Sequence, residues 1–308
     1  MTIFIWVLQL LFVPAVSPLC VGVIKKIKAK MQNRDGASIF QPYNDLWKLL
    51  HKDEIISKDA SWIFLRAPII VFSVTVIVGA SIPIFASFLN NSLTSDLFVL
   101  IYALAIGTFF LALAGLDTGG AFGGFGSSRE MTVSALAEGG FIFSLLTVAL
   151  LSGTTNVFAM LGVDAVDFNL SFLPLLLSFC GFFIVLLAET ARFPFDNPAT
   201  HLELTMIHEA MILEYSGKRL ALMEWAAANK LVIFAVLGAN LFFPFGTFQF
   251  VSVNSIFVGI VSILVKIFIV CFVVAILESV IAKYRFFRLP DLLILSFILN
   301  VVAIGLIH

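Results

Sequence analysis

The stretch SFLPLLLSFCGFFIVLLAETARFPFDNP (residues 171–198) decides the fold class of this chain. Residues 171–188 contain no charged side chain, and Glu189, Arg192 and Asp196 follow directly. An uncharged run of this length can cross the roughly 30 Å hydrocarbon layer of a bilayer as a helix. The stretch is therefore typical of a membrane-spanning helix that ends in a polar loop.

The rest of the chain repeats this pattern. Hydrophobic residues make up 61% and charged residues 12% of the sequence, whereas a soluble domain carries about 25% charged residues. We expect one integral membrane domain over residues 1–308, an all-α polytopic bundle of about eight transmembrane helices. The predicted spans are 2–23, 62–88, 97–115, 131–152, 171–189, 230–247, 254–281 and 290–307.

The basic residues predict the orientation of these spans. All but one of the 18 Lys and Arg residues lie in or beside the loops 24–61, 116–130, 190–229 and 282–289. With eight spans, these four loops fall on the same side of the membrane. By the positive-inside rule that side is cytoplasmic, and both termini lie on the non-cytoplasmic side.

Composition also excludes several functions. The formal net charge of -1 argues against a nucleic-acid-binding surface. Cys20, Cys180 and Cys271 lie singly in apolar segments, so we expect neither a metal site nor an iron–sulfur cluster in this chain. Gly115–Gly126 follows an apolar span, which argues against a phosphate-binding loop, and we expect it to be too rich in glycine for regular helix.

The first long loop predicts a short amphipathic helix. From Tyr43 to Leu50 the apolar residues share one broad face, and Asp45 and Lys48 lie on the other. Such a helix either anchors the loop on the membrane surface or lines a site at the cytoplasmic boundary. The loop alone favours neither interpretation.

Two glutamates lie at the start of the fourth span. Glu130 and Glu138 are eight residues apart, about 80° around a helix, so they can share a face. A buried carboxyl favours its neutral form and can take up and release protons. A protonated glutamate in one interhelical hydrogen bond is the alternative, but we favour proton handling.

The loop that follows Glu189 is also acidic. His201, Glu203, His208, Glu209 and Glu214 lie among apolar residues. Two His-Glu groups could in principle bind a metal ion, but their spacing is not HExxH, and neighbouring residues diverge on a helix. We therefore expect proton handling or docking here and no metal site.

Lys266 is the basic residue that topology does not explain, because it lies near the middle of the seventh span. A lysine at that depth requires a carboxylate partner or a water-filled cavity. We expect it to face the interior of the bundle.

Several motifs together carry a resemblance that covers nearly the whole chain. They are QPYNDLWKLLHKDE (Gln41–Glu54), GSSREMTVSALAE (Gly126–Glu138), ETARFPFD (Glu189–Asp196), LEYSG (Leu213–Gly217) and VKIF around Lys266. In these motifs the chain resembles membrane subunit 1, or H, of respiratory complex I. It is most similar to the branch found in energy-converting nickel–iron hydrogenases and formate hydrogenlyases.

The resemblance implies a non-catalytic subunit of a membrane oxidoreductase complex in a prokaryotic cytoplasmic (inner) membrane. Its partners would be peripheral large and small redox subunits, antiporter-like membrane subunits and lipid. The partners would hold iron–sulfur clusters and, in the hydrogenase branch, nickel–iron, while this chain would hold no cofactor. The chain would dock the redox arm and pass protonation changes to the antiporter-like subunits.

The resemblance also suggests roles for individual residues. Glu138, Glu189, Glu203 and Glu214 match acidic positions of the proton path, and Asp45, Arg192 and Asp196 match the lining of the junction with the peripheral arm. We add further polar residues from the same segments. These are Glu130 and Lys266 for the path, and Lys48, Asp117, Arg129, His201, His208 and Glu209 for the junction.

Departures from the pattern separate the branches. The first loop reads NRDGASIFQP where the quinone-reducing members share a Gly-Pro-Asn-Arg stretch, and the insert NPATHLELTMIHEAMI is similar to the hydrogenase side. Gln41-Pro42 is similar to the quinone side, so a subunit lining a quinone chamber remains the alternative. A stand-alone secondary transporter is a second alternative, although no inverted repeat is visible. A purely structural scaffold would leave Glu138 and Lys266 unexplained.

Overall fold

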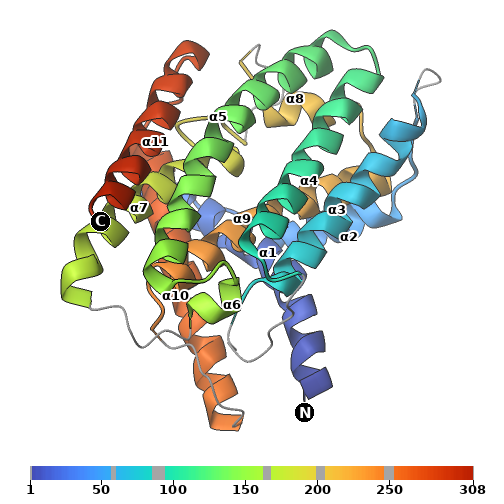
Figure 1. Cartoon of the computed structure of the whole chain (residues 1–308). Coiled ribbons are helices and arrows are strands. Elements are labelled where there is room, and N and C mark those ends of the chain that lie inside the picture. Colours follow the sequence, from blue (N-terminus) through green and yellow to red (C-terminus); the bar gives the residue numbers. More distant parts are fainter. Residues whose placement is uncertain are drawn as a thin grey trace.

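The computed structural model describes residues 2–56, 60–84, 94–161, 168–198, 205–245 and 253–307 (Figure 1). These residues form helices and loops, with no strand among them. Eight helices are long and apolar enough to cross a membrane, which confirms the predicted fold class. They are α1 (Thr2–Met31), α3 (Trp62–Ser81), α4 (Leu97–Asp117), α5 (Ala121–Ser152), α7 (Phe168–Glu189), α9 (Gly217–Leu241), α10 (Val253–Val280) and α11 (Leu289–Gly305).

Three short α-helices and one 3₁₀ helix complete the described part of the chain. They are α2 (Gln41–His51), α6 (Val157–Met160), α8 (His208–Ile212) and η1 (Phe286–Arg288). The helix predicted in the first loop is confirmed as α2, which buries Pro42 and Leu46 and exposes Trp47. Figure 1 shows α8 at the upper end of the bundle and α6 at the lower end.

The long helices form two groups around α9. In one group α1, α3 and α10 pack against α9, and in the other α5, α7 and α11 pack against one another. Helix α4 joins the groups, because it contacts both α3 and α5. Every residue from Leu231 to Leu241 of α9 is buried, so α9 is a central helix of the bundle.

The connections that follow α1, α4, α7 and α10 lie at one end of the bundle, because successive spans alternate in direction. We call this the basic end. It comprises residues 32–61, 118–120, 190–216 and 281–288, apart from those outside the described ranges. At the opposite end, α5 stops at Ser152, and Gly153 follows with a left-handed φ of 67°. A residue without a Cβ adopts that conformation most easily.

Some predicted helix boundaries are wrong. Helix α5 begins at Ala121 and α4 continues to Asp117, so most of Gly115–Gly126 is helical. Helix α9 begins at Gly217, well before the predicted residue 230, and ends at Leu241. Hydropathy marks only the part of a helix that faces hydrocarbon, so it missed the polar first turns of α5 and α9.

Pro18, within α1, frees the carbonyl group of Pro14 for a contact with α9. Pro18 has no N–H, so the carbonyl of Pro14 lacks its usual helical donor. The indole N–H of Trp225 donates to this carbonyl at 2.9 Å. Pro18 therefore helps to attach α1 to α9 beside the candidate site.

Glycine allows α4 and α5 to approach each other closely. A Cβ added to Gly123 would lie 2.1 Å from the carbonyl oxygen of Gly115, which is a backbone atom that no rotamer change can move. A Cβ added to the next residue, Gly124, would meet nothing within 4 Å. The two neighbours therefore form a matched pair for testing this contact.

We expect Gly123→Ala to destabilise the chain by about 1–3 kcal/mol, because the two helices must separate. Gly124→Ala should be neutral or stabilising by up to about 1 kcal/mol, because alanine is the better helix former. Thermal unfolding in detergent, followed by tryptophan fluorescence, measures both changes. Equal unfolding temperatures for the two variants would contradict the close contact.

Candidate functional site

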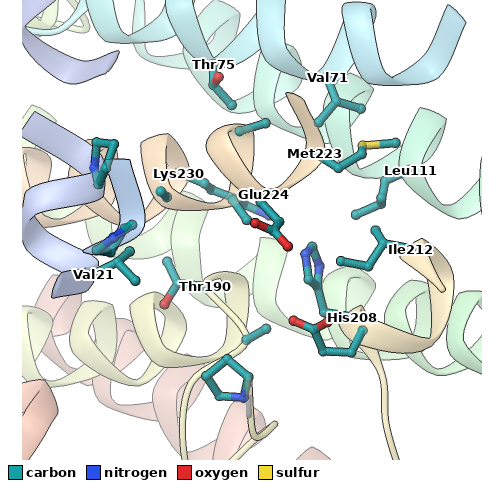
Figure 2. Close-up of a pocket in the computed structure, with 18 of the residues that line it drawn as sticks. Val21, Val71, Thr75, Leu111, Thr190, His208, Ile212, Met223, Glu224 and Lys230 are labelled. Carbon is teal, nitrogen blue, oxygen red and sulfur yellow. The ribbon is translucent and has the colours of Figure 1, made fainter. Parts of the chain in front are cut away.

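A cavity of about 510 Å³ lies between α1, α2, α9 and the segment that follows α7. Figure 2 shows that side chains from several helices, among them His208, Glu224 and Lys230, project into this space. Apolar side chains form most of its wall, but many ionisable groups also line it. These are Lys25, Lys28, Asp45, Lys48, Lys52, Glu130, Glu189, Arg192, Asp196, His208, Glu209, Glu224, Lys230 and Glu278.

An ion triad with a buried carboxylate at its centre lies on one wall of the cavity. The carboxylate of Glu278, near the end of α10, is 2.7 Å from Lys28 Nζ and 3.1 Å from a guanidinium nitrogen of Arg192. The side chain of Glu278 has no exposed surface. The triad connects α1, α10 and the turn after α7, and its two cations and one anion leave a net positive charge beside the cavity.

Asp196 organises the loop that follows α7. Its Oδ2 accepts hydrogen bonds from the backbone N–H groups of Ile207 and His208, at 3.1 and 3.0 Å. Its Oδ1 accepts one from the N–H of Asn197 and forms an ion pair with Lys283 Nζ at 2.6 Å. Asp196 therefore fixes the position of α8, which carries His208 and Glu209.

A further ion pair lies deeper in the bundle. Lys230 Nζ is 2.7 Å from a carboxylate oxygen of Glu189 and 3.2 Å from the hydroxyl of Thr108. Glu189 also lines a second, much smaller pocket together with Glu138. Glu189 thus borders both spaces, and it connects the large cavity to the half-buried Glu138 of α5.

Burial shifts the pKa values of the two ionisable residues of α8. Burial lowers the pKa of His208 to about 4, although the nearby negative charge of Asp196 opposes this shift. The Nε2 atom of His208 has no hydrogen-bond partner among the described residues. Burial raises the pKa of Glu209 to about 7, and the charges of Glu224 and Asp196 add to the shift. Near neutral pH, Glu209 can therefore exchange a proton.

The shift at Glu209 predicts a pH-dependent stability. Folded Glu209 keeps its proton up to about pH 7, compared with an ordinary value of 4.5. The folded chain binds the extra proton between these values, so its stability falls as the pH rises through this window. Glu209→Gln removes this loss of stability. The free energy of unfolding of the variant, relative to that of the parent, should therefore rise by about 1–3 kcal/mol between pH 4 and pH 8. Thermal unfolding in detergent at these two pH values measures the gain, and parallel pH curves would contradict the raised pKa.

The structure brings together eight of the predicted site residues. All of them line the large cavity: Asp45, Lys48, Glu130, Glu189, Arg192, Asp196, His208 and Glu209. Glu138 lies in the adjoining small pocket. His201 and Glu203 lie outside the described residues.

Four predicted residues lie away from the cavity wall. Asp117 Oδ2 accepts the backbone N–H groups at the start of α3, at 2.8 and 3.3 Å, which is a capping contact. The guanidinium of Arg129 lies over two phenylalanine rings and donates to the carbonyl of Met206. Glu214 is exposed. Lys266, at the middle of α10, lies beside the end of α9 and donates to Asn240 Oδ1 and the carbonyl of Phe243.

The structure describes two partners for Lys266. Its side chain is half-buried, as expected for a residue that faces the bundle, and it donates to an amide oxygen at 3.0 Å and a carbonyl oxygen at 2.7 Å. The sequence had left open a carboxylate partner or a water-filled cavity. The described partners are neutral oxygen atoms at the end of α9, where backbone carbonyl groups carry partial negative charge.

Sequence reasoning missed seven ionisable residues of the site. They are Lys25, Lys28, Lys52, Glu224, Lys230, Glu278 and Lys283. The positive-inside rule already accounted for the five lysines, so nothing in the sequence indicated that Lys28, Lys230 and Lys283 pair with acids. For Glu278, its position as an acidic residue at the end of an apolar span was the feature of the sequence that could have marked it as a site residue.

Among the described residues, no three His, Cys, Asp or Glu side chains are arranged to hold a metal ion. Two of the four residues that could in principle bind a metal ion, His201 and Glu203, lie outside those residues. The described site gathers ion pairs and the titratable Glu209 around one cavity.

Three curated proteins are similar to this chain along most of its length. Hydrogenase-4 component C of Escherichia coli (strain K12) is 34% identical over 93% of this chain and 90% of its own length. Formate hydrogenlyase subunit 4 of the same organism is 29% identical over 90% of each chain. The H subunit of the NADH-quinone oxidoreductase of Paraburkholderia xenovorans (strain LB400) is 29% identical over 92% of this chain and 84% of its own.

A solved structure shows the same fold. A chain of the membrane-bound sulfane sulfur reductase, an archaeal respiratory membrane complex, superposes with a TM-score of 0.81. It is 20% identical and covers 98% of this chain. The NADH dehydrogenase family matches residues 3–308. With eight candidate spans and this match along nearly its whole length, the chain belongs to the NADH dehydrogenase family, which includes the H subunits of complex I.

Proposed function

We propose that this chain is the membrane subunit of a redox-driven, proton-translocating complex of the hydrogenase or formate hydrogenlyase type. It docks a peripheral redox arm at the basic end and passes protonation changes to antiporter-like membrane subunits. The identity to hydrogenase-4 component C supports this branch. The chain supplies charged and titratable groups, and the redox centres, iron–sulfur clusters and nickel–iron, belong to partner subunits.

The observation that carries the proposal is a series of charged groups that line the cavity from the basic end to Glu138. Ion pairs at Asp196 and Glu278 lie on the side of the basic end, and the Lys230–Glu189 pair leads to the small pocket of Glu138. A change of charge at the docked redox arm alters the pKa of each paired group in turn, and one pKa unit corresponds to about 1.4 kcal/mol. Moving a proton against 100 mV costs about 2.3 kcal/mol, so a few coupled shifts suffice.

The orientation follows from the same proposal. The basic end faces the cytoplasm of a prokaryotic cell, the chain crosses the inner membrane, and both termini lie on the other side. The peripheral large and small subunits then contact α2, α8 and their flanking loops. The exposed face of α2 (Trp47, Lys48) is a suitable contact for them.

Binding of a quinone in the cavity is the second candidate function. A volume of about 510 Å³ is within the range of ligand pockets, and the largely apolar wall suits an isoprenoid quinone. The unpartnered His208 Nε2 is available for hydrogen bonding to a carbonyl oxygen. Quinone reduction by the purified complex, inhibited by substitution of His208, would favour this function over the hydrogenase type.

The partners that copurify with the chain distinguish these proposals. We would isolate the chain from native membranes in mild detergent and identify its partners by mass spectrometry. A large subunit with two CxxC pairs and bound nickel supports the hydrogenase type. A partner without them favours a quinone reductase or another redox reaction, and a chain recovered alone favours a secondary transporter.

Glu189→Gln tests proton coupling directly. We expect it to abolish redox-driven proton translocation in vesicles while electron transfer between soluble substrates continues, because glutamine cannot exchange a proton with Lys230 or Glu138. Glu138→Gln should have the same effect. Glu54→Gln is the matched control, since Glu54 pairs with Arg219 outside the cavity, and it should translocate normally. Full proton translocation by both Glu189→Gln and Glu138→Gln would refute the proposed path and favour a purely structural role for the chain.

A further inference from the structure

A column of polar side chains lies where α1, α3 and α9 pack against one another. Its first layer consists of Ser17, Thr75 and Asn229, which are all buried. The hydroxyl of Ser17 donates to Asn229 Oδ1 at 2.7 Å, and Asn229 Nδ2 donates to the hydroxyl of Thr75 at 3.1 Å. Thr75 also lines the large cavity, so this layer adjoins the candidate site (Figure 2).

A second polar layer lies at the end of α3 that is remote from the cavity. Gln9 Nε2 and Asn240 Nδ2 each donate to two carbonyl groups of residues 80–84, at 2.8 to 2.9 Å. Lys266 Nζ donates to Asn240 Oδ1 and to the carbonyl of Phe243, at 3.0 and 2.7 Å. One side chain from each of α1, α9 and α10 thus gathers around the end of α3.

This second layer has an unused acceptor. Gln9 is fully buried, and its Oε1 has no hydrogen-bond partner among the described residues. Buried polar atoms of this kind are normally satisfied by a donor, often a water molecule. The carbonyl oxygens of residues 80–84 and Phe243 are further acceptors. The layer therefore suits water that carries a proton.

An apolar layer separates the two polar layers. Val13 is fully buried and lies so close to α3 that a Cβ added to Gly79 would be 3.0 Å from its Cγ2 atom. On α9, Ile233 and Val236 are fully buried and lie on the face that carries Asn229 and Asn240. Along α1 the polar layers are about 12 Å apart, since Gln9 and Ser17 are eight residues apart.

We propose that this column is a gated proton route from the cavity to the opposite end of the bundle. The contact between Val13 and Gly79 is its gate, and Lys266 is its terminal group. An apolar constriction excludes water while it is closed. When α1 moves away from α3, water joins the two layers, and a proton taken up beside Thr75 is matched by one released beside Lys266. The source of the protons rests on the function proposed above.

Passive proton flow tests the gate without any redox reaction. The chain, together with the partners that copurify with it, is placed in vesicles that contain a pH-sensitive dye, in sodium-free buffer. A potassium gradient with valinomycin then drives protons. We expect Val13→Ser to raise proton entry several-fold over the parent, and the nearly isosteric Val13→Thr to raise it less.

Val133→Ser is the control for the gate, because Val133 is buried in α5 outside the column. It should leave the vesicles as tight as the parent. Proton entry that is unchanged in both Val13 variants would overturn the gate. So would proton entry that rises equally in Val133→Ser, because any buried hydroxyl would then open the bundle.

Lys266→Met tests the terminal group in the Val13→Ser background. We expect it to return proton entry to near the parent level, while Lys266→Arg keeps the raised entry. An unchanged leak in the Lys266→Met double variant would overturn the role of Lys266. A parent complex that pumps no protons, with the Val13→Ser leak still observed, would refute the proposed function and leave the route intact.

Discussion

Glu278→Ala is expected to destabilise the chain by about 3–5 kcal/mol, because it leaves the buried Arg192 and the partly buried Lys28 without their anion. Lys28 Nζ and the guanidinium of Arg192 lie 2.7 and 3.1 Å from the Glu278 carboxylate, and that side chain has no exposed surface. Lys28 also lies 5.4 Å from the centre of the Phe193 ring, which offers only weak compensation. Thermal or denaturant unfolding of the purified chain in detergent measures the loss.

Glu54→Ala is the matched control for this prediction. Glu54 also forms an ion pair, with Arg219, but about a fifth of each side chain is exposed, at 21% and 24%. Water can solvate the remaining charge there, so the cost should be about 1 kcal/mol or less. Similar losses of stability in Glu278→Ala and Glu54→Ala would show that Glu278 stabilises the chain no more than a surface ion pair does. Recovery of stability in Glu278→Leu with Lys28→Met and Arg192→Met would support unpaired charge as the cause.

The sequence was sufficient to predict the helices that cross the membrane. Runs of about 20 apolar residues have few alternatives to a spanning helix, because backbone groups in hydrocarbon require internal hydrogen bonds. The start of α9 was missed for a related physical reason. Residues 217–230 carry Lys218, Arg219, Glu224 and Lys230, and a hydropathy window counts these against a span although Glu224 and Lys230 line an internal cavity.

The sequence predicted most of the acidic residues of the candidate site, but not Glu224 or Glu278 and not the ion pairs. A carboxyl group in an apolar run is visible in the sequence, because charge at membrane depth is expensive. Its partner is set by packing between distant segments, as for Lys28 and Glu278 on α1 and α10. The partners of Lys266 have the same origin, since the end of α9 supplies oxygen atoms that no motif in the sequence indicates.

Asp196→Asn is expected to cost about 3 kcal/mol or more and to free the loop that carries α8. The two carboxylate oxygens accept three backbone N–H groups and pair with Lys283. An asparagine of the same shape supplies only one oxygen, and its NH₂ group then faces donors. The variant should also raise hydrogen exchange at the amides of Ile207 and His208, which mass spectrometry measures by peptide.

Asp117→Asn is the appropriate comparison, because Asp117 also accepts two backbone N–H groups but forms no described ion pair. Its effect should be that of an altered helix cap, about 1 kcal/mol, and it should leave the exchange of α8 unchanged. If Asp196→Asn exchanged as slowly as the parent at Ile207 and His208, Asp196 would not be what holds α8 against the cavity. In that case the packing of Ala210 and Met211 against Gly126 would be sufficient to position His208 and Glu209.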